Sequence, residues 1–259
     1  MGALGLNTGY FMTPDIKTAT EHPIIHIHDL AYAYEDGTPA LQGVDLHIER
    51  GESVALVGPN AAGKSTLLLH LNGFLRGSDT IRICGKAITD DNLPLIRSQV
   101  GMVFQEADHQ LFMLKVFEDV AFGPMNMGLS EDEVRTRVTE ALTAVNLRGY
   151  EERAPHHLSG GEKRAVAIAT VIAMRPEVLV MDEPSANLDP RTRRKLIALL
   201  NGMDITKLVA SHDLTFVLET CERTIVLDDG RTVADGPTRE LLASRDLMEQ
   251  HGLEVPPGL

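Results

Sequence analysis

The sequence has few basic residues and no long apolar run, and each shortage excludes a class of protein. Lys and Arg number 24 against 37 Asp and Glu, so the formal net charge is −13. A protein that binds duplex DNA or RNA needs a basic surface to neutralise phosphates, so we expect no nucleic-acid partner. The longest largely apolar stretch, Ala165–Met174, is far too short to cross a bilayer.

Cysteine is equally scarce. The chain has only two cysteines, Cys84 and Cys221, and their spacing suggests neither a disulfide framework nor a metal site. Residues 1–13 lack the basic and apolar regions of a secretory signal. We therefore expect a soluble, cytoplasmic protein of a reducing compartment. With 259 residues, 43% of them hydrophobic, the chain can form one large domain or two small ones.

The clearest chemical signal lies at residues 58–66. These residues are Gly58, Pro59, Asn60, Ala61, Ala62, Gly63, Lys64, Ser65 and Thr66. An apolar run that favours a strand precedes them and a helical pattern follows, which is the context of a phosphate-binding loop. Backbone N–H groups and the helix N-terminus would bind phosphate. Lys64 would reach the β- and γ-phosphates and Ser65 would bind Mg²⁺, so the stretch predicts nucleotide binding.

Two other predicted strands end in residues suited to phosphate chemistry. The strand at 178–181 leads into Asp182 and Glu183, and the strand at 207–210 leads towards His212. Ligands of open α/β sheets bind at the C-terminal ends of strands. Asp182 therefore fits a supporting role for Mg²⁺ and Glu183 fits a base for water. An acidic pair after a strand is usually a turn and a lone histidine is usually structural, but the phosphate loop favours the functional interpretation.

A second candidate anion site begins at Ser159. Ser159 and Glu162 have the spacing of a capping box at the start of a helix. An ordinary helix cap explains these two residues, but it does not explain Gly160 and Gly161 between them. Two glycines at a helix start are typical of an anion-binding N-terminus.

Residues 102–127 are rich in methionine and phenylalanine. They include Met102, Phe104, Phe112, Met113, Phe117, Phe122, Met125 and Met127. A hydrophobic core explains some of these residues. Flexible methionines beside phenylalanines also form protein docking surfaces, so we expect part of 102–127 to bind an amphipathic helix of another subunit.

In this order, the motifs resemble the ATP-binding cassette family over residues 24–240. The resemblance assigns Tyr34 to adenine stacking, 58–65 to Walker A, Gln105 to the Q-loop and Mg²⁺, 158–162 to the signature motif, 178–182 to Walker B, Glu183 to the catalytic carboxylate, 185–189 with Asp189 to the D-loop, and His212 to the switch histidine. Ser159, Gly160, Gly161 and Glu162 would then contact nucleotide, and ATP and Mg²⁺ are the implied cofactors.

The resemblance also implies the fold and the domain boundaries. We expect an α/β P-loop NTPase core with a mixed, mainly parallel sheet, an antiparallel β subdomain and a helical signature subdomain at about 106–162. Residues 1–23 would form an irregular extension and 241–259 a C-terminal tail. Ala61 stands where the family often has glycine. Only an obligatory positive φ would make alanine costly there, so we expect little effect.

A narrower resemblance covers residues 103–112 and 119–124, which are similar to ATPases of energy-coupling-factor importers of the cobalt and nickel branch. It implies an ATPase that powers import of Co²⁺ or Ni²⁺ at the cytoplasmic face of the membrane. The implied partners are a second ATPase subunit in a head-to-tail homodimer, a membrane coupling (T) component and a substrate-binding (S) component. Because a separate subunit binds the solute, we expect no cobalt site at His26 and His28 or at His156 and His157.

Three alternatives compete with this interpretation, and the sequence argues against the second and the third. The same type of ATPase serves vitamin-specific importers. A chromosome or DNA-repair cassette would carry a long coiled-coil insertion between Lys64 and Ser159, and the interval here is too short. A nucleotide-gated protein without turnover would not need Glu183 and His212.

Overall fold

The computed structural model describes residues 22–76 and 80–259, so all but the last two residues of the expected N-terminal extension lie outside it. The central sheet of the described residues has six strands in the order β10-β9-β3-β8-β7-β6. They are β3 (Ser53–Val57), β6 (Val100–Val103), β7 (Val178–Asp182), β8 (Thr206–Ala210), β9 (Arg223–Asp228) and β10 (Arg231–Pro237). All neighbours are parallel except β10, which returns antiparallel to β9 through the turn at Asp229 and Gly230.

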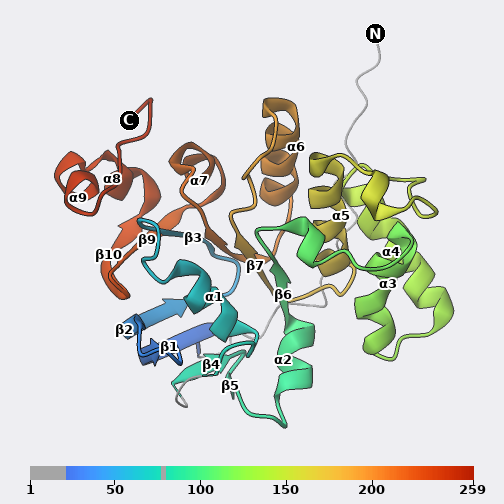
Figure 1. The fold of residues 1–259 in the computed structure, drawn as a ribbon, viewed down its shortest axis with the longest axis horizontal. Coiled ribbons are helices and arrows are strands. Elements are labelled where there is room, and N and C mark those ends of the chain that lie inside the picture. The colour runs from blue at the N-terminus through green and yellow to red at the C-terminus, as the bar shows by residue number, and fades with distance from the viewer. Residues whose placement is uncertain (1–21, 77–79) are drawn as a thin grey trace.

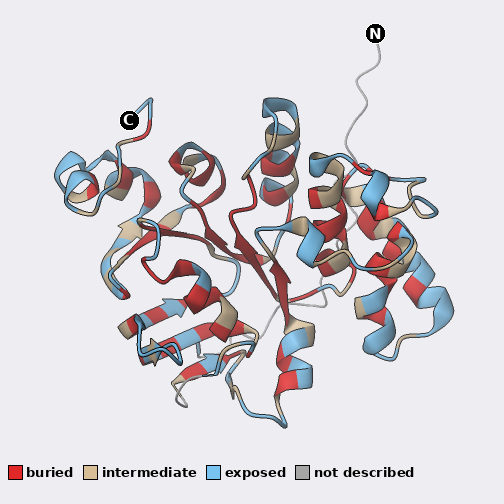
Figure 2. Cartoon of the chain, viewed as in Figure 1, coloured by how far each residue is buried: buried red, intermediate tan, exposed pale blue. Residues whose placement is uncertain are grey.

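The five parallel strands of the central sheet are buried on both faces, as their apolar runs require, whereas the edge strand β10 is partly exposed (Figure 2). Val54 and Leu56 point into one hydrophobic cluster, whereas Ala55 and Val57 point into the other. Figure 1 shows α1 (Lys64–Leu71) on one side of this sheet and α5 (Gly160–Ile172), α6 (Pro190–Asn201) and α7 (Leu214–Thr220) on the other. The sheet thus separates the helix after the phosphate loop from the signature helix.

A second, antiparallel sheet covers the α1 side. Its described strands are β1 (Ile25–Ala33), β2 (Pro39–Ile48), β4 (Ile81–Ile83) and β5 (Lys86–Ala87), in the order β2-β1-β4-β5. Ile25 pairs with Ile48 and Ile27 with Leu46, and all four side chains are buried. His26 and His47, which pair between them, are exposed. This alternation is what a sheet with one solvated face requires.

The remaining helices lie around these sheets. They are α2 (Leu93–Gln99), α3 (Val116–Asn126), α4 (Glu131–Ala144), α8 (Thr238–Ala243) and α9 (Arg245–Gln250), with short 3₁₀ turns at η1 (Ala107–His109) and η2 (Pro155–His157). Ser130 caps α4 by accepting a hydrogen bond from the backbone N–H of Glu133. Helices α3, α4 and α5 pack together at one end of the molecule (Figure 1).

The C-terminal segment packs on the core. Helix α8 runs across the expected boundary at residue 240, and Leu242 and Met248 are fully buried in the cluster that contains α5 and α7. In the described part of the chain, no helix is long and apolar enough to span a membrane.

Candidate functional site

The phosphate loop leaves β3 through a bend that only glycine permits. Gly58 has a φ of 153° and Gly63 a φ of 100°. A Cβ atom on Gly58 would lie 2.0 Å from the carbonyl oxygen of Leu227, and one on Gly63 would lie 2.5 Å from that of Ala40. Both glycines are therefore fixed by neighbouring backbone as well as by their own dihedral angles.

Ala61 is the strained residue of this loop. Its φ is 63°, in the left-handed region, so the condition under which alanine becomes costly is met. The expectation of little effect at this position is corrected accordingly. The strain lies in the loop that would hold phosphate.

Lys64 begins α1 with its ammonium group folded over the loop. Its Nζ atom donates hydrogen bonds to the carbonyl oxygens of Gly58 and Pro59, at 2.7 and 2.8 Å. Burial lowers the pKa of Lys64, and the nearby carboxylates of Glu183 and Asp182 oppose that shift. A desolvated cation at the centre of a bent loop suits an anionic ligand.

Asp182 ends β7 beside the start of α1. Burial raises its pKa, while the neighbouring Ser65 hydroxyl, Lys64 and Arg164 lower it. Hydroxyl and carboxylate oxygens are the hard donors that Mg²⁺ prefers, so this pair fits the expected ion. Among the described residues, no hydrogen bond joins the side chain of Gln105 to either group, and that side chain is exposed.

Glu183 and His212 meet at the ends of neighbouring strands β7 and β8. His212 Nδ1 lies 2.8 Å from Glu183 Oε2. The carboxylate also accepts hydrogen bonds from the backbone N–H of His212 and from the Ser211 hydroxyl, the latter at 3.2 Å. Glu183 itself has a φ of 46°, and backbone strain of this kind clusters at functional sites. The carboxylate is thus held in one orientation at the ligand edge of the sheet.

Tyr34 lies next to the phosphate loop at the end of β1. Its hydroxyl is 2.7 Å from the hydroxyl of Thr66, and the residue is 43% exposed. Tyr32 meets the Tyr34 ring edge to face at 5.4 Å. An exposed, supported aromatic ring beside the loop is suitable for stacking on a base.

Arg164 is a residue that the sequence reasoning missed. It is buried in α5 and donates hydrogen bonds to the backbone carbonyls of Phe104 and Gln105. These bonds attach the segment at Gln105 to the signature helix. One signal was available, because Arg164 falls in the apolar stripe of Ala167, Ile168 and Val171, where an unpaired charge is rare.

The signature helix begins with the predicted capping box. Ser159 Oγ donates to Glu162 Oε2 at 2.7 Å, and the Ser159 N–H donates to the same oxygen at 2.9 Å. Tyr150 donates to the other carboxylate oxygen at 2.7 Å. The Ser159 hydroxyl lowers the pKa of Glu162. Ser159 and Gly160 are exposed, and the helix that they begin packs on the face of the central sheet opposite α1.

Asp189 caps α6 instead of reaching the phosphate loop of its own chain. Its carboxylate accepts hydrogen bonds from the backbone N–H groups of Arg191 and Thr192 and from the Thr192 hydroxyl. The D-loop is therefore ordered by its own helix start. Glu183, by contrast, lies two residues before the beginning of this loop and belongs to the strand edge.

The histidines considered above for a cobalt site, His26, His28, His156 and His157, are all exposed. His28 Nδ1 lies 2.7 Å from Asp45, and the rings of His156 and His157 lie 4.2 Å apart. Among the residues that the structure describes, no group of three or more His, Cys, Asp or Glu side chains is arranged to hold a metal ion.

Comparison with known proteins identifies the family. The family model described as ABC transporter matches residues 41–186. The chain is 49% identical over 239 residues to the energy-coupling factor transporter ATP-binding protein EcfA of Methanothermobacter thermautotrophicus, covering 90% of this chain and 77% of the relative. It resembles the solved structure of CbiO1 from Clostridium perfringens, described as part of the ABC transporter complex CbiONQ, with 38% identity, a TM-score of 0.78 and coverage of 89% and 94%.

A further solved structure supports the same assignment. The ATP-binding cassette MJ0796, a dimer in a post-hydrolysis state bound to ADP and Pi, is 28% identical with a TM-score of 0.75, over 83% of this chain and 99% of that one. The likeness to both solved cassettes confirms the predicted fold class. The chain belongs to the ABC transporter family of ATP-binding ATPases.

Proposed function

We propose that the chain is the ATP-hydrolysing subunit of an energy-coupling-factor importer and that it powers uptake of a transition-metal ion, Co²⁺ or Ni²⁺. The observation that carries the hydrolytic part is the convergence of Lys64, Asp182 and the Glu183–His212 pair at one edge of the central sheet. Each group has a distinct task in phosphoryl transfer to water.

Hydrolysis needs charge neutralisation, positioning and a base. Lys64 would exchange its two carbonyl partners for phosphate oxygens. Ser65, Asp182 and Gln105 would hold Mg²⁺, which when bound neutralises phosphate charge. Glu183, oriented by Ser211 and His212, would accept a proton as water oxygen bonds to the γ-phosphorus and the bond to the β-phosphate oxygen breaks.

The catalytic unit is a dimer in this proposal. The signature helix α5 and the phosphate-loop helix α1 pack on opposite faces of the central sheet. An anion at Ser159 and Gly161 must therefore come from a second chain, as a γ-phosphate in a head-to-tail arrangement. The dimeric state of the cassette MJ0796 supports this assembly. We expect the second chain to be identical.

The coupling surface is assigned to an exposed apolar patch on the helical end of the molecule. We define this docking patch as Phe112, Leu114, Phe122, Met125 and Met127, which are 38% to 81% exposed. The rings of Phe112 and Phe122 meet edge to face at 5.2 Å. Five large apolar side chains exposed along residues 112–127 suit an amphipathic helix of a membrane subunit.

The docking patch is anchored from below by a buried carboxylate. Asp119 accepts hydrogen bonds from the backbone N–H groups of Phe112 and Met113, at 3.0 and 3.1 Å. Burial raises the pKa of Asp119 and these two bonds lower it. The loop that presents Phe112 is therefore fixed to α3, so the two would move together.

The same region is bonded to the signature helix. Gln110 donates to the Ala167 carbonyl and to the Thr170 hydroxyl, and it accepts from the N–H of Phe104. Lys163 pairs with Asp108 at 2.6 Å. A partner that moves the docking patch would thus move both the segment at Gln105 and α5, which is what coupling of ATP to transport requires.

The assignment of the solute rests on the resemblance of residues 103–112 and 119–124 to the cobalt and nickel branch. CbiO1 is described as part of an ABC transporter complex, which supports assembly of this chain with membrane T and S components at the cytoplasmic face. The EcfA relative supports the energy-coupling-factor class, and a vitamin-specific importer with the same ATPase type is the second candidate. Purifying the chain from its native host and identifying the associated membrane proteins distinguishes the two, and uptake of labelled Co²⁺ tests the first directly.

A single substitution tests the catalytic assignment. Glu183→Gln should retain ATP binding, measured by calorimetry, and lose about a hundredfold or more in phosphate release, because the amide cannot take the proton from water. Glu222→Gln is the matched control, since Glu222 is exposed at the opposite edge of the same sheet. Wild-type turnover in Glu183→Gln would contradict the role of this carboxylate.

Assembly is tested with the same variant. The isolated protein should be monomeric without nucleotide, and Glu183→Gln with ATP should accumulate as a dimer in light-scattering measurements. A monomer under these trapping conditions would refute the head-to-tail site.

A further inference from the structure

The two glycines of the signature stretch have different surroundings within their own chain. A Cβ atom built on Gly160 would meet no other atom within 4 Å. One built on Gly161 would lie 2.9 Å from Cγ2 and 3.2 Å from Oγ1 of Thr192. Nothing in the chain itself therefore requires glycine at 160, whereas the close approach of α6 requires it at 161.

Thr192 is not free to move away from Gly161. Its hydroxyl donates to Asp189 Oδ2 at 2.5 Å, and its backbone N–H donates to Asp189 Oδ1 at 3.2 Å. A β-branched side chain in a helix has few allowed rotamers. Turning Thr192 to make room for a side chain at Gly161 would break the bond between its hydroxyl and the D-loop aspartate.

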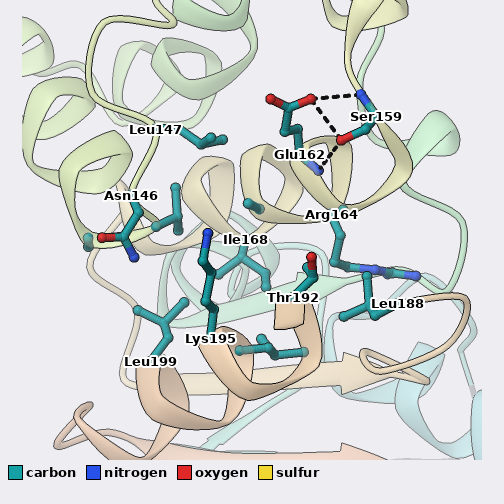
Figure 3. Close-up of a pocket in the computed structure, with 15 residues that line it drawn as sticks. Asn146, Leu147, Ser159, Glu162, Arg164, Ile168, Leu188, Thr192, Lys195 and Leu199 are labelled. Carbon is teal, nitrogen blue, oxygen red and sulfur yellow. Dashed lines mark hydrogen bonds between the residues drawn. The ribbon is translucent and has the colours of Figure 1, made fainter. Parts of the chain in front are cut away.

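Gly161 and Thr192 both line a cavity of about 120 Å³ between α5, α6 and residues 144–147 at the end of α4. Figure 3 shows Thr192, Lys195 and Leu199 rising from α6, with Ser159 and Glu162 on the other side. At Thr192 and Gly161, the start of α6 packs directly against the start of α5.

We propose that Thr192 is a positioning residue that fixes the signature helix relative to the D-loop, and that Gly161 is glycine because Thr192 of the same chain occupies the space of a side chain. Ser159 and Asp189 then move as one unit when two chains meet. The catalytic consequence rests on the proposed ATPase function. Gly160 has no such neighbour in its own chain, so glycine there would be required by the nucleotide of the second chain, which Ser159 and Gly161 also contact in the proposed dimer.

Thermal unfolding of the nucleotide-free protein tests the contact without any assay of activity. Gly161→Ala should lower the Tm. The double variant Gly161→Ala with Thr192→Ala should have the same Tm as Thr192→Ala alone, because only the Thr192 Cβ, at 3.5 Å, would then remain near the new methyl group. Gly160→Ala is the matched control and should not lower the Tm, since its methyl group enters open space.

ATP hydrolysis tests the positioning role. Gly161→Ala should lose about tenfold or more in kcat, and Thr192→Ala should recover it to the level of Thr192→Ala alone. The same second change should not rescue Gly160→Ala. Thr192→Ser, which keeps the bond to Asp189, should retain more kcat than Thr192→Val, which keeps the methyl contact, with the KM for ATP changed by less than about twofold in either.

The outcomes separate the two proposals. A wild-type Tm in Gly161→Ala together with no rescue of kcat by Thr192→Ala would overturn the contact as the reason for this glycine. Equal kcat in Thr192→Ser and Thr192→Val would overturn the positioning role. If no variant, wild type included, hydrolyses ATP, the proposed function fails while the unfolding comparison still decides the contact.

Discussion

Replacing Ala61 with glycine should stabilise the nucleotide-free protein. Ala61 has a φ of 63°, and a Cβ atom in the left-handed region costs roughly 1–2 kcal/mol. Glycine removes that cost, but its extra freedom in the unfolded chain costs roughly 0.5–1 kcal/mol. Because Ala61 is exposed, its methyl group contributes no buried area that would be lost. The net gain in the free energy of unfolding is therefore about 0.5–1 kcal/mol.

For a chain of this size, such a gain raises the Tm by about 2 °C. Differential scanning calorimetry without nucleotide is the direct assay. Ala62→Gly is the matched control one residue away, because Ala62 is 2% exposed and has no positive φ. Losing its buried methyl group and gaining backbone freedom should cost about 1.5 kcal/mol and lower the Tm.

The pair of variants isolates backbone strain from all other effects of adding a glycine to this loop. Both changes remove one methyl group from neighbouring residues of the same loop, yet they should shift the Tm in opposite directions. If Ala61→Gly lowers the Tm as Ala62→Gly does, the loop is not strained at residue 61 and the reasoning is refuted.

Three further results are expected. Lys64→Ala should weaken ATP binding in calorimetry and reduce phosphate release, since it removes the buried cation of the loop; wild-type affinity would argue against that role. Calorimetry with Co²⁺ should detect no specific site, and micromolar, stoichiometric binding abolished by changing His26 and His28 would prove this wrong. Met125→Glu in the docking patch should abolish assembly with the membrane subunits or solute uptake while the isolated chain still hydrolyses ATP. Asn126→Asp, at the exposed polar neighbour, is the control; if both variants assemble and transport equally well, the docking surface lies elsewhere.

Much of the candidate site could be predicted because its chemistry is encoded by short, local spacing. The loop at 58–66 lies between a strand and a helix. Parallel strands all end at the same edge of the sheet, so Asp182, Glu183 and His212 reach that edge whatever the order of their strands. The direct contact of Glu183 with His212 needed one more fact, namely that β7 and β8 are neighbours. That fact is a property of the folded sheet.

Contacts between distant parts of the chain could not be predicted. Arg164 reaches the carbonyls of Phe104 and Gln105, 60 and 59 residues earlier, and the approach of Thr192 to Gly161 depends on how α5 and α6 cross. Composition also does not separate core from surface. Met102 is 7% exposed and belongs to the core, whereas Met125, from the same rich segment, is 63% exposed.

Helix α5 is the element to which the separate motifs are attached. Its N-terminus carries the signature stretch, and Gly161 packs against Thr192, which holds the D-loop aspartate. One turn later, Arg164 holds the backbone at Gln105, and Ala167 accepts from Gln110 beside the docking patch. A phosphate at the start of this helix and a membrane subunit at the patch would therefore act on the same rigid body. In the proposed function, coupling would therefore require no signal through the central sheet, because displacing α5 would move the signature stretch, the segment at Gln105 and the docking patch together.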